Sequence, residues 1–133
     1  MSVLVDTPVW SLVLPRRDGS KPEIRTALEE LILTSQAKII GPIRQEVLSG
    51  IAHAEQYEKL RQRLRAFPHL PLETRHFETA AEMFDLCRKV GVQGSSTDFL
   101  LCSVAQEEGL QIFTTYGDFE HYAKVLGLSL YRL

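Results

Sequence analysis

The feature that most constrains the fold is an alternation of short apolar, β-prone runs with longer segments of helical pattern. Strands that alternate with helices in this way are typical of parallel βαβ units, because parallel strands need a crossover between them. The expected strands cover residues 3–5, 37–40, 68–72, 110–114 and 128–131. We therefore expect an α/β fold: a three-layer α/β/α sandwich with a mainly parallel five-stranded sheet and about seven helices, formed by a single domain over residues 1–133.

The helix expected over residues 74–90 is the longest in the chain. Its apolar spacing predicts that Phe77, Ala81, Phe84 and Cys87 lie on the buried face. A second apolar segment, residues 99–105, is hydrophobic on most sides, which predicts a central helix.

Charge and cysteine usage indicate where the protein works. Fifteen Lys and Arg residues against seventeen Asp and Glu give a formal net charge of −2, which excludes a polybasic nucleic-acid binder. Cys87 and Cys102 form no CxxC pair and fall in expected helices, which favours buried thiols in a reducing compartment. The first residues lack the pattern of a signal peptide, and no apolar stretch is long enough to span a membrane. We expect a cytoplasmic protein with no membrane partner.

Four acidic residues are expected at one edge of the sheet. Asp6 directly follows the first strand, and Glu46 lies in the first turns of the helix after the second strand. Asp98 and Asp118 lie at the starts of later helices. Taken singly, each has a simpler explanation: helix capping for the aspartates or for Thr7, and solvent exposure for the glutamate. Their common placement favours a shared site, because open α/β sheets bind ligands outside the carboxyl ends of the strands.

The chemistry of this acidic group favours a hard metal ion. Clustered carboxylates repel one another and take up protons unless a cation neutralises them. Carboxylate oxygens suit Mg²⁺ or Mn²⁺, and the sequence has no His/Cys constellation that suits Zn²⁺. Such an ion polarises a phosphoryl oxygen and lowers the pKa of a bound water. The residues therefore favour hydrolysis of a phosphodiester.

Four segments of the chain resemble, in their order and spacing, the motifs of PIN-domain ribonucleases. They are residues 4–10, 42–50, 96–101 and 114–119, so the resemblance extends over nearly the whole chain. In particular, the chain resembles the toxins of VapBC toxin–antitoxin pairs, which are single PIN domains. The resemblance implies an endoribonuclease that depends on Mg²⁺, with Mn²⁺ as a plausible substitute, and that uses water as the nucleophile.

The resemblance also implies roles for individual acidic residues. Asp6, Glu46 and Asp98 correspond to the core acidic residues around Mg²⁺. Asp118 corresponds to a fourth acidic residue, which completes a second or looser site. The chain departs from the family at Tyr116, where many members have Asp or Asn.

Further residues are expected to support the site or to contact substrate. The small hydroxyl residues beside the acidic ones are expected to hold a water or a carboxylate: Thr7, Ser96 and Thr97. Weak candidates for contacts with RNA phosphates are the basic residues near the first loop and beside Glu46: Arg16, Arg17 and Arg44. A solvated surface is the simpler explanation for most of these arginines.

The family resemblance implies three partners: an RNA substrate, a cognate antitoxin whose tail lies across the acidic cleft, and a second copy in a homodimer. The alternative is a catalytically silent PIN-like domain that binds RNA or a protein. A phosphoryl acceptor of the receiver or haloacid-dehalogenase type also places an Asp after the first strand. The dehalogenase pattern requires a second Asp where this chain has Pro8, and a receiver requires a Lys after a late strand, which residues 114–116 do not provide.

Overall fold

The computed structural model describes residues 2–13 and 21–133, which form an α/β fold around a short parallel sheet. Its strands, in the spatial order β2-β1-β3, are β1 (Val3–Val5), β2 (Ala37–Lys38) and β3 (Gln111–Phe113). Val3 pairs with Ala37 on one side and with Gln111 on the other, and both pairings are parallel. The first strand of the chain therefore lies in the centre of the sheet.

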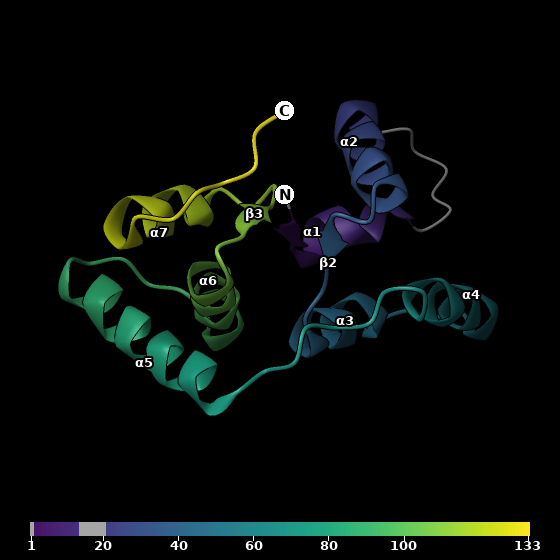
Figure 1. The fold of residues 1–133 in the computed structure, drawn as a ribbon. Helices are drawn as coiled ribbons and strands as arrows, with labels where there is room; N and C mark the ends of the chain where they lie inside the picture. Colours follow the sequence, from purple (N-terminus) through teal and green to yellow (C-terminus); the bar gives the residue numbers. More distant parts are fainter. Residues whose placement is uncertain (1, 14–20) are drawn as a thin grey trace.

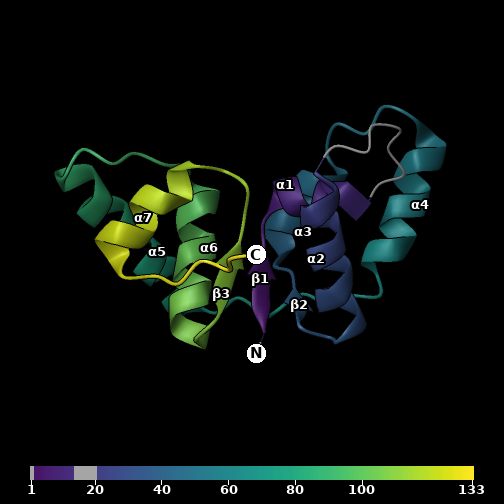
Figure 2. The same cartoon turned by 90° about the horizontal axis from the view of Figure 1, so that it is seen from above.

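Helices flank the strands in two groups, as Figure 1 and, from above, Figure 2 show. One group consists of α1 (Thr7–Trp10), the 3₁₀ turn η1 (Ser11–Val13), α2 (Pro22–Leu33), α3 (Gly41–Leu48) and α4 (Ala54–Leu64). The other consists of α5 (Thr74–Lys89), α6 (Ser96–Glu108) and α7 (Asp118–Leu126). The arrangement agrees in outline with the expected α/β/α sandwich.

Prolines start three of the helices in the first group. Pro8, Pro22 and Pro42 each lie in the first two positions of their helix, where the missing N–H costs nothing. Because α1 and α3 begin directly after the first two strand segments, the chain turns sharply at the carboxyl edge of the sheet. This turn places Asp6, and the helix that carries Glu46, at that edge.

The expectation of five strands is wrong, because the described residues contain three. In the segment 68–72, two prolines remove N–H donors, and Leu70 makes a single backbone hydrogen bond to Ile39, at 2.9 Å. Leu130 forms an isolated parallel bridge with Ile112. That bridge does not extend into a strand, because β3 is only three residues long and its Phe113 carbonyl faces the opposite side, where it accepts from Asp6.

The buried face of α5 also differs from the expectation. Phe77 and Phe84 are 52% and 38% exposed, and Ala81 is exposed as well. Cys87 is buried as expected, and the other buried residues are His76, Ala80 and Met83. The two aromatic rings line an apolar groove of about 460 Å³ between α5 and α6.

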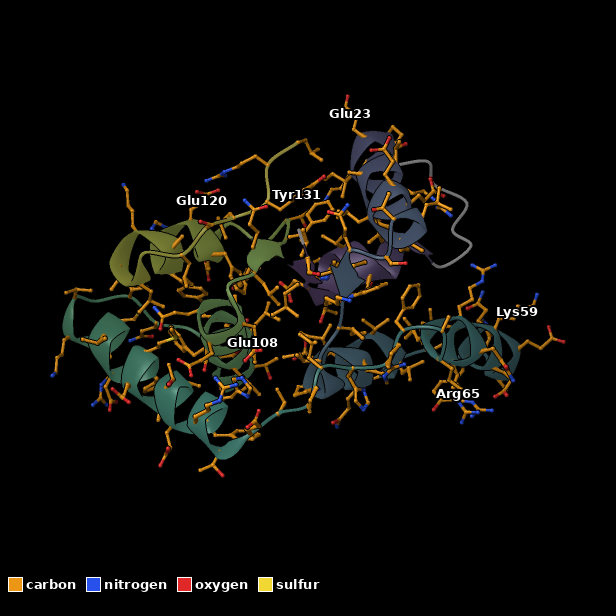
Figure 3. The ribbon with its side chains drawn as sticks, in the orientation of Figure 1. Glu23, Lys59, Arg65, Glu108, Glu120 and Tyr131 are labelled. Atoms are coloured by element: carbon orange, nitrogen blue, oxygen red, sulfur yellow. The ribbon has the colours of Figure 1, made fainter. Side chains whose placement is uncertain are left out.

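Hydrogen bonds of His76 fix this rotation of α5. The ring accepts from the N–H of Glu73 through Nδ1, at 2.9 Å, so its Nε2 carries the proton that faces Glu108, at 3.0 Å. The hydroxyl of Ser103 on α6 donates to the backbone carbonyl of His76, at 2.6 Å. Glu108, labelled in Figure 3, lies at the end of α6 beside α5. These polar contacts hold the His76 face against α6 and leave the phenylalanine face outside.

The cysteines agree with the expectation of buried thiols. Cys87 and Cys102 are both buried and free. Burial raises the pKa of each thiol above its ordinary value, which disfavours the reactive thiolate. Among the described helices, none combines the length and the apolar character that a membrane span requires.

Candidate active site

Three of the expected acidic side chains line one open hollow at the carboxyl edge of the sheet. Asp6, Glu46 and Asp98 come from the end of β1, from α3 and from the first turn of α6. The hollow has a volume of about 330 Å³, and its remaining lining consists of Thr7, Pro8, Thr115 and Tyr116. Residues that are far apart in the sequence therefore converge where ligands of α/β sheets bind.

Asp6 is the most buried of the three carboxylates, with 6% of its surface exposed. Its Oδ1 accepts from the N–H of Thr7 and its Oδ2 from the hydroxyl of Thr114, both at 2.8 Å. Asp6 is thus the N-cap of α1, so capping and a place in the acidic hollow are compatible. Of the two capping candidates, Asp6 is the N-cap, since Thr7 is the first residue of the helix.

Burial raises the pKa of Asp6 above its ordinary value, and the charges of Asp98 and Glu46 raise it further. The hydrogen bonds from Thr114 and from the backbone of Thr7 oppose this increase. The carboxylate of Asp6 is therefore ionised at a cost in free energy. A cation beside it would remove that cost.

Glu46 reaches the hollow from the exposed side of α3. Its Oε1 accepts a hydrogen bond from the hydroxyl of Thr7, at 2.7 Å. Thr7 therefore contacts two of the acidic residues, Asp6 through its N–H and Glu46 through its hydroxyl. The Thr7 hydroxyl thus contacts a carboxylate, and its supporting role in the site stays a prediction.

Both the backbone and the side chain of Asp98 make hydrogen bonds. Its N–H donates to the hydroxyl of Ser95, the N-cap of α6, at 3.1 Å. Its Oδ2 accepts from the phenol of Tyr122 on α7, at 2.7 Å. Burial is the main cause that raises the pKa of Tyr122, and this hydrogen bond is the second. The phenol therefore stays protonated and remains a donor.

Asp118 does not line the hollow of the other three acidic residues. It lines a neighbouring depression of about 200 Å³ together with His121 and Tyr122. It is the first residue of α7, with Gly117 at the N-cap, so the simpler explanation, that Asp118 is the N-cap of this helix, does not hold. Tyr116 connects the two places, because it lines the acidic hollow and its hydrogen bond with Asp118 raises the pKa of the Tyr116 phenol.

The other candidates that the structure describes do not line the acidic hollow. Ser96 and Thr97 line the apolar groove between α5 and α6. The guanidinium of Arg44 donates to the backbone carbonyls of Leu64, at 2.7 Å, and Phe67, and to Nδ1 of His69, at 3.0 Å. It thus ties α3 to the end of α4, and its contact with RNA stays a prediction. The two other candidate arginines, Arg16 and Arg17, lie outside the described residues.

The hollow fits a hard divalent ion by chemistry and by charge. Its three carboxylates offer only oxygen donors, which suit Mg²⁺ and Mn²⁺. Across residues 2–13 and 21–133, no three acidic, histidine or cysteine side chains stand close enough together to hold a metal ion. Ligation by all three carboxylates at once would need them to draw closer, and a cation would offset the repulsion that opposes this movement.

Two polar residues that hold the carboxylates, Thr114 and Tyr122, were not predicted from the sequence. The position of Thr114 could have been used to predict its role, since it directly follows a strand, at the same sheet edge as Asp6. No local sequence pattern indicated the role of Tyr122, because its partner Asp98 lies 24 positions away on another helix. Only the packing of α7 against the start of α6 brings them together.

Comparisons with known proteins agree with this fold. The PIN domain family matches the sequence over residues 3–125. No curated protein sequence matches the chain. The structure is similar to FitAcB from Neisseria gonorrhoeae, with a TM-score of 0.74 and 17% identity over 98% of this chain and 96% of that one.

Two further solved structures are similar over their whole length. VapBC2 from Rickettsia felis, bound to a DNA fragment from their promoter, has a TM-score of 0.73 and 15% identity, covering 100% of this chain and 99% of that one. A toxin–antitoxin complex from Klebsiella pneumoniae has a TM-score of 0.68 and 23% identity, covering 99% and 100%. At these levels of sequence identity, the similarity to the solved structures establishes a shared fold.

Proposed function

Because the chain belongs to the PIN domain family, we propose that it is an endoribonuclease that hydrolyses RNA phosphodiester bonds with a divalent metal ion, Mg²⁺ or Mn²⁺. PIN domains are generally nucleases. The observation that carries the proposal is the convergence of Asp6, Glu46 and Asp98, from three separate elements, on one open hollow. We assign these three residues as the metal ligands and Asp118 as a looser fourth acidic residue.

The side chains around the hollow prepare it for this chemistry. When bound, the metal ion lowers the pKa of a water and stabilises negative charge on phosphoryl oxygens. Thr114 and the N–H of Thr7 hold both oxygens of Asp6, while the Thr7 hydroxyl directs Glu46. Hydrolysis joins the water oxygen to phosphorus and breaks a phosphorus–oxygen bond of the backbone, and the leaving oxygen takes up a proton.

Metal dependence tests the proposal directly. The purified chain is expected to cleave RNA with Mg²⁺ or Mn²⁺, to lose all cleavage in a chelator, and to recover it when metal is restored. Gel analysis of a mixed RNA substrate measures this. The Asp98→Asn variant, purified in parallel, controls for contaminating ribonucleases and is expected to be inactive.

Two other results would reject the proposal. Cleavage that persists in the chelator would exclude a metal-dependent reaction. RNA binding without cleavage, at any concentration of either metal, would instead support the silent PIN-like domain.

We infer further that the chain is the toxin of a toxin–antitoxin pair, that it forms a homodimer and that it works in the cytoplasm. One of the similar structures is a toxin–antitoxin complex, and the two buried free thiols suit a reducing compartment. Expression of the chain alone is expected to arrest growth, whereas co-expression with a small reading frame directly upstream of its gene restores growth. The two products are expected to purify together.

Light scattering of the purified chain is expected to give twice the mass of one chain. A single-chain mass would reject the homodimer. Growth arrest that no neighbouring reading frame relieves would reject the pairing with an antitoxin.

A further inference from the structure

A buried tyrosine on α7 contacts one of the proposed metal ligands. Tyr122 is 0% exposed, and its hydroxyl donates to Oδ2 of Asp98 at 2.7 Å. The hydroxyl also lies 3.4 Å from the carbonyl of Gln93, a much longer contact. The carboxylate is therefore the principal acceptor of this phenol.

Aromatic packing leaves the Tyr122 ring little freedom to move. Its centroid lies 5.0 Å from the centroid of Phe99 on α6 and 5.0 Å from that of Phe119 on α7. Phe99 and Phe119 are themselves buried, with 1% and 0% of their surfaces exposed. The phenol is thus a fixed donor that points at Asp98 from the interior.

Gly94 makes the approach of this phenol possible. A Cβ atom at position 94 would lie 2.3 Å from the hydroxyl oxygen of Tyr122 and 2.7 Å from its Cζ. Both distances are far shorter than van der Waals contact. Any residue other than glycine would therefore displace the phenol from its place beside Asp98.

We propose that Tyr122 is a positioning residue, which orients the carboxylate of Asp98 toward the acidic hollow. The backbone of Asp98 is set by Ser95 at the start of α6, but this bond does not fix the rotation of the carboxyl group. The phenol fixes that rotation by holding Oδ2, which leaves Oδ1 for a metal ion. The inference rests on the proposed function, since it assumes that Asp98 is a metal ligand.

Mn²⁺ binding tests the proposal without relying on catalysis. Tyr122→Phe removes the hydroxyl and keeps the ring, and we expect the affinity for Mn²⁺, measured from the paramagnetic resonance signal of the free ion, to fall about tenfold. Cleavage at limiting metal is expected to fall with it and to recover partly at high Mn²⁺. The matched control is Tyr131→Phe, which removes a hydroxyl from a ring packed on Phe113 with centroids 4.8 Å apart, and which is expected to leave Mn²⁺ affinity unchanged.

Gly94→Ala provides a second, independent variant. It is expected to lower the Mn²⁺ affinity as Tyr122→Phe does, because the new methyl group displaces the phenol. The two effects are expected not to add in the double variant, since both act through one hydrogen bond. Tyr122→Phe is also expected to restore part of the melting temperature lost in Gly94→Ala, because it removes the atom nearest to the methyl group.

The outcomes separate this proposal from the proposed function. Unchanged Mn²⁺ affinity in a folded Tyr122→Phe or Gly94→Ala variant would overturn the positioning role, even if the wild type cleaves RNA. An equal loss in Tyr131→Phe, or a wild type that binds no Mn²⁺, would also overturn it. A loss confined to the Tyr122 and Gly94 variants supports it, even if no RNA is cleaved.

Discussion

Replacing Asp6 with asparagine is expected to remove nearly all RNA cleavage and, without metal, to stabilise the fold. Loss of one metal ligand removes several kcal/mol of transition-state stabilisation, so we expect cleavage to fall by about three orders of magnitude. Asparagine is as good an N-cap as aspartate, and its amide still meets the hydroxyl of Thr114 and the N–H of Thr7. The substitution therefore removes the charge and keeps the capping contact.

The gain in stability follows from the raised pKa of Asp6. Between the ordinary pKa of an aspartate and this raised value, the folded state binds more protons than the unfolded state. The free energy of unfolding of the wild type therefore falls as the pH rises through that range, and the penalty is fully present above it. In the Asp6→Asn variant this contribution is absent, so its melting temperature in chelator at neutral pH is expected to exceed that of the wild type.

Thermal unfolding with and without Mg²⁺ measures both effects. Mg²⁺ is expected to raise the melting temperature of the wild type, by linkage of binding to folding, and to leave Asp6→Asn unchanged. Asp85→Asn, a substitution of an exposed aspartate on α5, serves as the control and is expected to keep activity and metal response. Full cleavage by Asp6→Asn would contradict the assignment of Asp6 as a ligand.

Replacing Trp10 with alanine is expected to cost about 3–5 kcal/mol of the free energy of unfolding. Trp10 is 0% exposed, and its ring packs against Phe67 with centroids 5.2 Å apart. Such a loss is a large fraction of the stability of an ordinary domain, about 5–15 kcal/mol. Urea unfolding followed by far-UV circular dichroism measures it, since Trp10 is the single tryptophan and its fluorescence is lost with it.

Trp10→Phe is the matched control for this prediction. The indole Nε1 of Trp10 is buried and has no hydrogen-bond partner in the described part of the chain. Leaving a buried donor unsatisfied costs about 1–3 kcal/mol, and phenylalanine removes that penalty while keeping an aromatic ring. We therefore expect Trp10→Phe to cost less than half as much as Trp10→Ala. Equal costs would contradict this expectation.

Local signals were sufficient to predict the part of the site nearest to the first strand. The apolar run before Asp6 and the proline after it determine both the end of β1 and the start of α1. The same reasoning applies to Glu46, because Gly41 and Pro42 start the helix that carries it. These placements depend on neighbours along the chain, so a single sequence contains the information.

Other features depend on partners that are distant in the sequence. Two apolar stripes of α5 are alternatives for burial, and contacts of His76 with Glu108 and Ser103 on α6 decide between them. Phe77 and Phe84 are therefore exposed although their spacing is that of a core face. The separation of Asp118 from the other acidic residues likewise depends on how α7 packs, which no local pattern determines.

The central position of β1 has a consequence for the synthesis of the chain. Asp6 is made long before its partner, because the hydroxyl that holds its Oδ2 belongs to Thr114, 108 positions later. Asp98 likewise receives its phenol from Tyr122. The acidic hollow therefore lacks its final geometry until translation has passed residue 122. A nascent chain that is shorter than this cannot form the complete site.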